Sequence, residues 1–345
     1  MGESSAESAR ETPAARPPKR LIGAILAVLT LAATGASADC VYTRAAVFPL
    51  APELRPTIDV TVNGAHVLFV VDTGAETSSV TPEAVLSLQL LRDRHHRTTI
   101  TTMDGTETRD NVIVRQLEIG DLKYNELSVA VQPLGRLGSH EPLAGVLGAD
   151  VLSDFDIEVD MPRRTLTFYH VSGCEFARPP WTGRYQTVRA LMTHRGRLLF
   201  PIDIDGHPLT ALFDTGANHV VLSHTAALGL GLTNAALAAD LPLRGTSGGH
   251  SAVTAHRHIF GEIKIGDEVF HNQPIDIAQV DIGDADLLVG AIYQRSRRFF
   301  LSYSTNAIFI QREQSLVQLN NAVLPLAPRG AAPVQGANPP ATRPP

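Results

Sequence analysis

The chain of 345 residues has only two cysteines, no excess of basic residues and no apolar run long enough to span a membrane. Its formal net charge is −6, and no dense basic segment occurs, so charge gives no support for nucleic-acid binding. Residues 21–33 are mostly apolar, but this run is shorter than the roughly 20 residues of a membrane helix and is broken by Thr and Gly. Hydrophobic residues make up 44% of the chain, enough for a sizeable core. The length predicts one large or two modest domains.

The N-terminal segment has the pattern of an export signal. Lys19 and Arg20 precede the apolar run, and the Ala-Ser-Ala triplet at 36–38 fits an A-x-A cleavage site. The pattern predicts a signal peptide over residues 1–38. We therefore expect a protein that a bacterial-type cell exports to the periplasm or to the extracellular medium. The alternative is a retained N-terminal anchor, which would hold the protein at the membrane or allow transient association with it.

The tetrapeptide Asp-Thr-Gly-Ala occurs twice, at residues 72–75 and 214–217, each time after an apolar strand pattern. At the same offset of 142 residues, Asn-Gly at 63–64 matches Asp-Gly at 205–206, and both pairs are strong hairpin signals. Apolar and polar residues alternate around each turn, which is the period of half-buried strands. An apolar-apolar-Gly step also recurs downstream at the same offset. The repeat is far longer than a solenoid module and indicates two homologous lobes.

Asp72 and Asp214 are the candidate catalytic residues. Two carboxylates brought to hydrogen-bond distance cannot both ionise comfortably, so such a pair holds one proton between them. The pair can therefore act as base and acid in one turnover, as hydrolysis of a peptide bond by an activated water requires. For either aspartate alone, the competing interpretation is an ordinary surface turn.

The residues beside the two aspartates are predicted to support the site. The hydroxyls of Thr73 and Thr215 can bond across to the opposite loop and lock the loops together. Gly74 and Gly216 let the backbone approach the carboxylates, so that amide groups can hydrogen-bond to them. The alanine after each glycine is small and leaves room for substrate.

These motifs resemble those of the aspartic peptidases of the pepsin and retropepsin type, over most of residues 55–312. The alanine after each Asp-Thr-Gly, the stretch Phe155–Asp160 and the short lobes are similar to the bacterial retropepsin-like group. Two lobes in one chain are similar to pepsins. The resemblance implies a mostly β, bilobal acid-protease fold with two homologous β-barrel-like lobes, each with one or two short helices. It also implies a monomeric aspartic-type endopeptidase, acting on peptide or protein substrates without metal or cofactor.

Lobe 2 departs from the pattern of lobe 1 after its apolar-apolar-Gly step. Ile292 stands where lobe 1 has Asp150, and Arg295, Arg297 and Arg298 follow closely. This difference puts the terminal helix of lobe 2 and the contacts between the lobes in question. The three arginines are expected to pair with the acidic surplus rather than to bind an anion.

The boundaries follow from the repeat. We expect lobe 1 over residues 41–170, a linker over 171–185, lobe 2 over 186–312 and a disordered tail, rich in Pro and Ala, over 313–345. Short helices are expected near 81–90 and 223–230. Cys40 and Cys174 flank lobe 1, and in an oxidising compartment two cysteines are enough for one disulfide; two free buried thiols are the alternative.

The resemblance also implies flaps, which are glycine-bearing hairpins that cover the substrate. Corresponding segments of the two lobes have the sequence of hairpin tips, and ordinary exposed hairpins are the alternative. The flap candidates are Asp104, Gly105, Thr246, Ser247 and Gly248.

The sequence also allows three other interpretations of its function. Residues 245–249 fit the Gly-x-Ser-x-Gly motif of serine hydrolases, but a strand pattern and not a helix follows them. His256 and His258 share one face of an expected strand, but no third metal ligand stands at a convincing spacing. The serious alternative is a catalytically silent peptide-binding module with the same fold, because fold does not determine function. Such proteins usually lose an aspartate or its threonine, and both are present in each loop here.

Overall fold

The computed structural model describes residues 40–312, except 51–54, 103–104, 135–141, 174–175 and 248–250. The predicted signal segment over 1–38 and the predicted tail over 313–345 lie outside the described residues. All described residues belong to one unit of the chain. In this part of the chain, no helix is long and apolar enough to cross a membrane.

Lobe 1 is built on a seven-stranded sheet. Its first strand also pairs with its sixth, β2 with β6, so that the sheet closes on itself in the manner of a barrel. In order across the sheet, the strands are β2 (Thr57–Val62), β3 (Ala65–Val71), β8 (Leu143–Leu147), β4 (Ser79–Val80), β7 (Leu122–Val131), β6 (Gly105–Ile119) and β5 (Leu91–Thr102).

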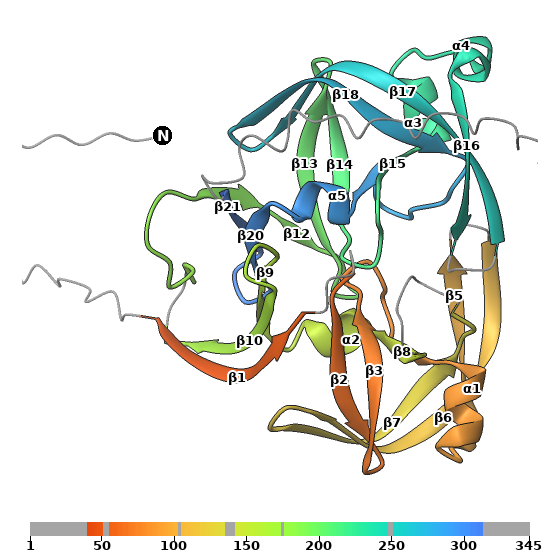
Figure 1. The fold of residues 1–345 in the computed structure, drawn as a ribbon, viewed down its shortest axis with the longest axis vertical. Coiled ribbons are helices and arrows are strands. Elements are labelled where there is room, and N and C mark those ends of the chain that lie inside the picture. Colours follow the sequence, from red (N-terminus) through yellow and green to blue (C-terminus); the bar gives the residue numbers. More distant parts are fainter. Residues whose placement is uncertain are drawn as a thin grey trace, which may run out of the picture. The chain divides into compact units, whose positions relative to one another are not determined.

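Lobe 2 repeats this strand order in an eight-stranded sheet with one extra edge strand. The pairing that closes lobe 1 recurs here between β13 and β17. In order, the strands are β12 (Leu191–Met192), β13 (Leu198–Ile204), β14 (His207–Phe213), β19 (Leu287–Val289), β15 (Val220–Ser223), β18 (Glu268–Ala278), β17 (Ser251–Ile265) and β16 (Leu241–Ser247). Figure 1 shows the equivalent hairpins β2–β3 and β13–β14 pointing in opposite directions.

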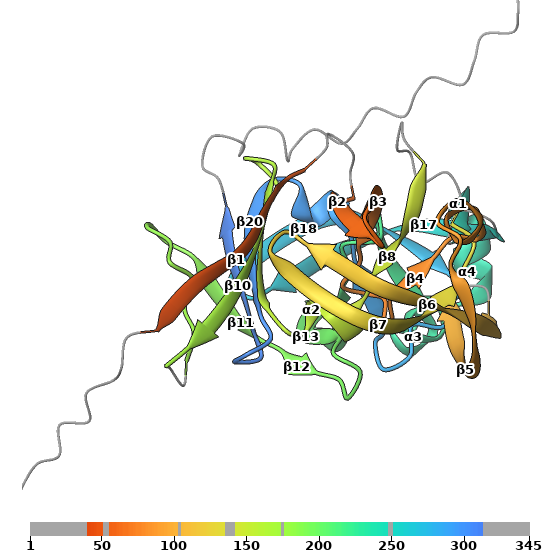
Figure 2. The same ribbon diagram turned by 90° about the horizontal axis from the view of Figure 1, so that it is seen from below.

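A six-stranded sheet joins the two lobes, and its strands come from both (Figure 2). In order, they are β1 (Val41–Pro49), β10 (Thr165–Ser172), β9 (Asp156–Asp160), β20 (Arg297–Ser302), β21 (Ala307–Arg312) and β11 (Gln186–Arg189). The lobes meet where β9 pairs antiparallel with β20, with Val159 opposite Phe299. Both residues are completely buried, so this junction is continuous with the core.

Five short helices complete the described residues: α1 (Pro82–Ser87), α2 (Ala149–Leu152), α3 (His224–Gly229), α4 (Asn234–Ala239) and α5 (Ala291–Gln294). The helices α1 and α3 lie at the two predicted positions, because Thr81 and Ser223 cap them in the same way. Each hydroxyl accepts the amide three residues on at 3.1 Å. Lobe 2 also contains α4, a third helix that the sequence analysis did not anticipate.

The repeated hairpin turns have the geometry that their sequences predict. Asn63 and Gly64 have φ of 52° and 87°, and Asp205 and Gly206 have 50° and 82°. Two consecutive positive φ values match the right-handed twist of the flanking strands and are the reason for Asn-Gly and Asp-Gly. The alternating apolar residues before each turn are buried, which confirms the predicted inward faces. These residues are Ile58, Val60, Val62, Phe200, Ile202 and Ile204, each at most 4% exposed.

Candidate active site

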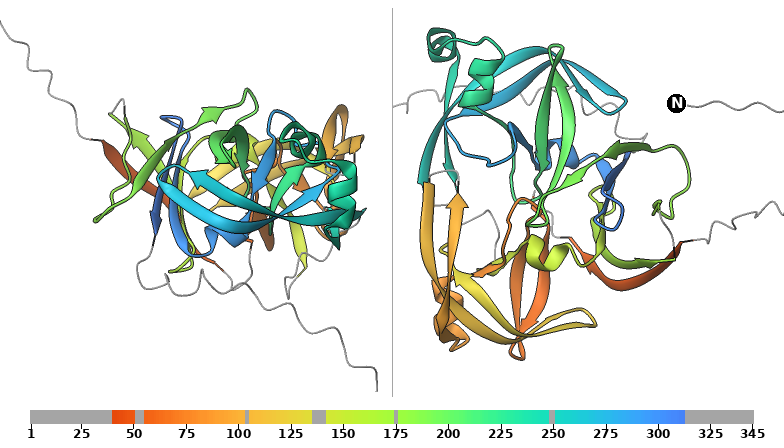
Figure 3. Two further views of the ribbon diagram at one scale, coloured as in Figure 1. Left: turned by 90° about the horizontal axis from the view of Figure 1, so that it is seen from above. Right: turned by 180° about the vertical axis from the view of Figure 1, so that it is seen from behind.

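The two Asp-Thr-Gly loops meet between the lobes. Asp72 follows β3 and Asp214 follows β14, and Figures 1 and 3 show the ends of these strands converging. A backbone bond holds each loop to the neighbouring parallel strand. The amide of Asp72 donates to the carbonyl of Leu147 at 3.0 Å, and that of Asp214 donates to Val289 at 3.2 Å. The two loops are thus anchored by the same device at the repeat offset of 142.

Four hydrogen bonds lock the loops to each other through Thr73 and Thr215, both completely buried. The amide of Thr73 donates to Oγ1 of Thr215, and the amide of Thr215 donates to Oγ1 of Thr73, each at 3.1 Å. The two hydroxyls donate in turn to carbonyls of the opposite loop. Thr73 bonds to Phe213 at 2.7 Å and Thr215 bonds to Val71 at 2.6 Å. Because every donor and acceptor lies across the junction, the threonines fix the distance between the aspartates.

The carboxyl groups of Asp72 and Asp214 hydrogen-bond to each other. In each residue, Oδ1 also accepts two backbone amides of its own loop. Asp72 accepts those of Gly74 and Ala75 at 2.9 and 3.0 Å, and Asp214 accepts the equivalent pair at 2.8 and 3.0 Å. Both aspartates are only half-buried, so solvent reaches the pair. This arrangement orients two carboxyl groups around one position open to water.

The two aspartates share this geometry, and the pKa of each is raised, but the charges around them differ. Burial raises the pKa of Asp72, and its two amide bonds and the charge of Arg55 oppose that rise. Burial also raises the pKa of Asp214, to well above its ordinary value, and the negative charge of Asp72 raises it further. The two carboxyl groups therefore titrate as a unit that holds one proton, and the positive charge of Arg55 favours the ionised form of Asp72.

The glycines of both loops pack against the opposite carboxyl group. A Cβ atom on Gly74 would lie 2.6 Å from Cγ of Asp214, and one on Gly216 would lie 2.2 Å from Oδ2 of Asp72. No side chain fits at such distances without moving the aspartate. The repeated glycine is thus explained by the closeness of the two loops, in addition to the turn itself.

The flap candidates lie at the tips of equivalent hairpins. In lobe 1, Thr102 pairs with Gly105, so the turn between β5 and β6 has two residues, and Asp104 lies outside the described residues. In lobe 2, Thr246 and Ser247 end β16 and Ser251 begins β17. Gly248 lies outside the described residues. The structure therefore places Gly105, Thr246 and Ser247 on hairpins, and the role of the candidates as flaps stays a prediction.

The disulfide between Cys40 and Cys174 also stays a prediction, because Cys174 lies outside the described residues. The surrounding chain segments do come together. Val41 pairs with Ser172, and the sulfur of Cys40 lies 3.5 Å from the carbonyl oxygen of Phe176. The segments before and after Cys174 are thus both in contact with the start of β1.

The competing chemistries find little support in the described residues. The element that follows β16 in the described residues is the antiparallel strand β17, beginning at Ser251, and not the helix that a nucleophile elbow requires. Nδ1 of His258 lies 2.7 Å from Asp240, an ordinary ion-pair contact. Within the described ranges, no group of three metal-ligating side chains is found.

The residues that set lobe 2 apart have structural partners. Arg297 is nearly fully buried and pairs with Glu268 at 3.0 Å. Arg298 pairs with Glu158 of lobe 1 at 2.9 Å and stacks over Trp181, whereas Arg295 is exposed. Arg298 thus reinforces the junction between the lobes, as the expected pairing with acidic residues implies.

At the start of α2 and α5, the two lobes use different side chains in equivalent places. In lobe 1, Asp150 accepts the amide and hydroxyl of Ser78 at 2.8 and 2.7 Å. In lobe 2, the equivalent residues are Val220 and Ile292, and α5 forms without this polar pair.

Two residues near the aspartates were not found by sequence reasoning. Gln294, fully buried, donates through Nε2 to the carbonyls of Asp214 and Val289, both at 3.0 Å, and so supports the second loop from below. Arg55, half-buried ahead of β2, interacts electrostatically with Asp72 and Asp214. The equivalent of Gln294 in lobe 1 is Leu152, so the repeat carries no signal for it. For Arg55 a signal existed, because an arginine recurs at residue 197.

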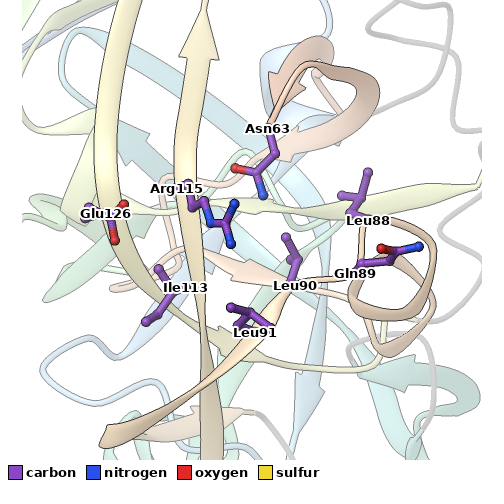
Figure 4. Close-up of a pocket in the computed structure, with 8 residues that line it drawn as sticks. All are labelled: Asn63, Leu88, Gln89, Leu90, Leu91, Ile113, Arg115 and Glu126. Carbon is purple, nitrogen blue, oxygen red and sulfur yellow. The ribbon is translucent and has the colours of Figure 1, made fainter.

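A cavity of about 470 Å³ lies on lobe 1. Figure 4 shows its lining, which combines apolar side chains with two opposite charges. The lining residues are Asn63, Leu88, Gln89, Leu90, Leu91, Ile113, Arg115 and Glu126. None of them belongs to the Asp-Thr-Gly loops, so this cavity is separate from the candidate active site.

The chain matches the model of a known protein family. The model of the family described as aspartyl protease matches residues 58–151 and 200–292, which together are more than half of the chain. Each matched segment contains one Asp-Thr-Gly loop, and the segments begin 142 residues apart. None of the curated proteins compared with the chain matches it.

Proposed function

The chain belongs to the aspartyl protease family, and on that premise we propose that it is an exported aspartic endopeptidase in which Asp72 and Asp214 activate one water. The observation that carries the proposal is the pair of half-buried carboxyl groups that hydrogen-bond to each other. Burial and mutual repulsion leave one proton on such a pair, and the pair remains open to solvent. It can therefore take a proton from water and give one to the substrate.

We assign the role of base to Asp72, because the positive charge of Arg55 favours its ionised form. Asp72, the ionised member, takes a proton from the bound water as it attacks the carbonyl carbon of the peptide. Asp214, which holds the shared proton, gives it to the carbonyl oxygen. When the tetrahedral intermediate collapses, Asp72 gives its proton to the leaving amine as the C–N bond breaks. Asp214 takes a proton back from a hydroxyl of the intermediate, so the carboxylic acid product forms and the pair again holds one proton. No metal or cofactor is needed for this sequence of transfers.

The experiment is a peptide-library digest by the purified mature protein between pH 3 and pH 8, with and without pepstatin. The variants Asp72→Asn and Asp214→Asn serve as controls, since each keeps the size of the side chain and abolishes the shared proton. We expect cleavage by the wild type alone, with turnover in either variant reduced at least about 10³-fold. A wild type that binds peptides without cleaving any would instead identify a silent binding module.

We further propose that the mature protein acts as a monomer and carries a Cys40–Cys174 disulfide. Both aspartates come from one chain, so the pair is complete without a partner subunit. Sequence supports export through the signal pattern at residues 1–38. The contact of Cys40 with Phe176 supports the disulfide. Mass spectrometry of the periplasmic protein under non-reducing conditions tests export and the disulfide. A free thiol at Cys40 would contradict the disulfide.

A further inference from the structure

Each half of the repeat has an arginine ahead of its Asp-Thr-Gly loop. Only the first half has an acidic residue directly after its Asp-Thr-Gly-Ala tetrapeptide. Arg55 and Arg197 are equivalent, since each stands two residues before a paired strand position at the offset of 142. Glu76, just after the first Asp-Thr-Gly-Ala, is equivalent to Asn218 after the second. For Arg197, the residue at the matching position of the other lobe is Glu76, which has a carboxylate. For Arg55, it is Asn218, which has an uncharged amide.

The complete pair joins the lobes. Nη2 of Arg197 lies 3.0 Å from Oε1 of Glu76, and Arg195 binds the other oxygen of the same carboxylate. The side chain of Arg197 is 12% exposed, so this ion pair is largely shielded from solvent. The positive charge of Arg197 is therefore compensated within the protein.

Arg55 has no such partner. Among the described residues, its guanidinium makes no ion pair, which sets it apart from Arg197; the buried Nε atoms of both arginines have no hydrogen-bond partner there. The side chain is half-buried, and its charge interacts with Asp72 and Asp214 without hydrogen-bonding to either. A guanidinium that has lost part of its hydration binds a carboxylate strongly, because its planar fork matches two carboxylate oxygens.

We propose that Arg55 binds a carboxylate of the peptide substrate, close to the scissile bond, and so makes peptides with an acidic group there the preferred substrates. The proposal rests on the proposed function, because it takes Asp72 and Asp214 as the place where the peptide bond lies. Glu76 supplies a carboxylate to Arg197, but Asn218 has none to offer to Arg55. We propose that the substrate supplies this carboxylate instead. The carboxylate comes either from an Asp or Glu side chain or from the C-terminus of a peptide cut near its end.

The test uses pairs of peptides, chosen from those that the wild type cleaves, which differ only by Glu or Gln near the cleaved bond. A second set differs only by a free or amidated C-terminus. We expect a preference of about tenfold or more in kcat/KM for the charged member of one set, as one charge-assisted hydrogen bond provides. That set identifies the source of the carboxylate. In Arg55→Gln the preference should fall to near unity, mainly through KM.

Arg195→Gln is the matched control, because it removes the same charge and leaves Arg197 paired with Glu76. It should keep the preference, whereas Arg55→Glu should reverse it in favour of Lys-containing peptides. A wild type without preference, or a preference that survives in Arg55→Gln, would overturn the inference while cleavage itself upholds the proposed function. Binding of the same peptides to Asp214→Asn, measured by fluorescence anisotropy, separates the two ideas. A charge preference there without any wild-type cleavage supports Arg55 and refutes the peptidase.

Discussion

The lock between the loops allows a sharp test through Thr73→Val, which keeps the shape of the side chain and removes Oγ1. That oxygen accepts the amide of Thr215 at 3.1 Å and donates to the carbonyl of Phe213 at 2.7 Å. Thr73 is completely buried, so water cannot replace the lost partner at either place. The substitution therefore strands one buried donor and one buried acceptor at the junction of the lobes.

The size of the effect follows from these two groups. A buried polar group left without a partner costs about 1–3 kcal/mol, so the free energy of unfolding should fall by roughly 2–6 kcal/mol. Thr73→Ser is the control, because it keeps both hydrogen bonds and loses one buried methyl, at a cost of about 1 kcal/mol. Thr215→Val should cost as much as Thr73→Val, since its bonds have matching lengths.

Urea-induced unfolding at fixed pH measures these differences, and kcat on a cleaved peptide measures their effect on the aspartates. Because the lock sets the distance between the carboxyl groups, we expect the valine variants to lose activity even where they remain folded. If Thr73→Val unfolds with a free energy within about 0.5 kcal/mol of Thr73→Ser, the four hydrogen bonds do not hold the loops together.

The remaining predictions concern the carboxyl groups and the glycines. Since burial raises the pKa of both aspartates above the ordinary 3.8, kcat/KM should follow a bell-shaped profile with both limbs above that pH; an alkaline optimum would contradict it. The pKa of Asp214 is higher in the folded protein than in the unfolded chain, so between these two values the folded protein binds more protons. Wild-type stability therefore falls as pH rises through that window. Asp214→Asn removes this term, and urea titrations should show a weaker loss of stability with pH in that window; an unchanged slope would count against the shared proton. Gly216→Ala places a methyl 2.2 Å from Asp72 and should lower kcat about 100-fold, whereas Gly229→Ala, with open space around it, should not; equal activity of the two variants would refute the close packing.

Much of the fold could be predicted because the repeat is written in local signals. The family and the mostly β, bilobal fold were confirmed. A turn pair such as Asn63-Gly64 predicts a hairpin because both residues accept positive φ. The buried face of a strand is predicted by the alternation of apolar and polar residues. Neither prediction requires knowledge of the rest of the chain. The duplication also predicts that the two lobes share one strand order, although it does not say which order that is. Local chemistry also explains why the caps at Thr81 and Ser223 begin helices where they were expected.

The contacts between lobes could not be predicted, because they depend on how two folded units dock. The sheet that pairs β9 with β20, the ion pair of Arg298 with Glu158 and the support of Asp214 by Gln294 all join residues far apart in sequence. No periodicity or motif indicates such partners. Arg297 and Arg298 were expected only to find acidic residues, and the particular residues emerged from the docked lobes.

The two loops are nearly identical in backbone and hydrogen bonds, yet the charges around their aspartates differ. Each Oδ1 accepts two amides at 2.8–3.0 Å, so the loops alone would give both residues the same affinity for the proton. The difference must come from groups that the duplication did not preserve. Arg55 interacts electrostatically with both aspartates and has no ion-pair partner among the described residues, whereas Arg197, its equivalent, is compensated by Glu76. Replacement of a carboxylate by Asn218 in one lobe therefore leaves the positive charge of Arg55 uncompensated beside the pair, where it favours ionised carboxylates, an asymmetry that two identical halves could not have.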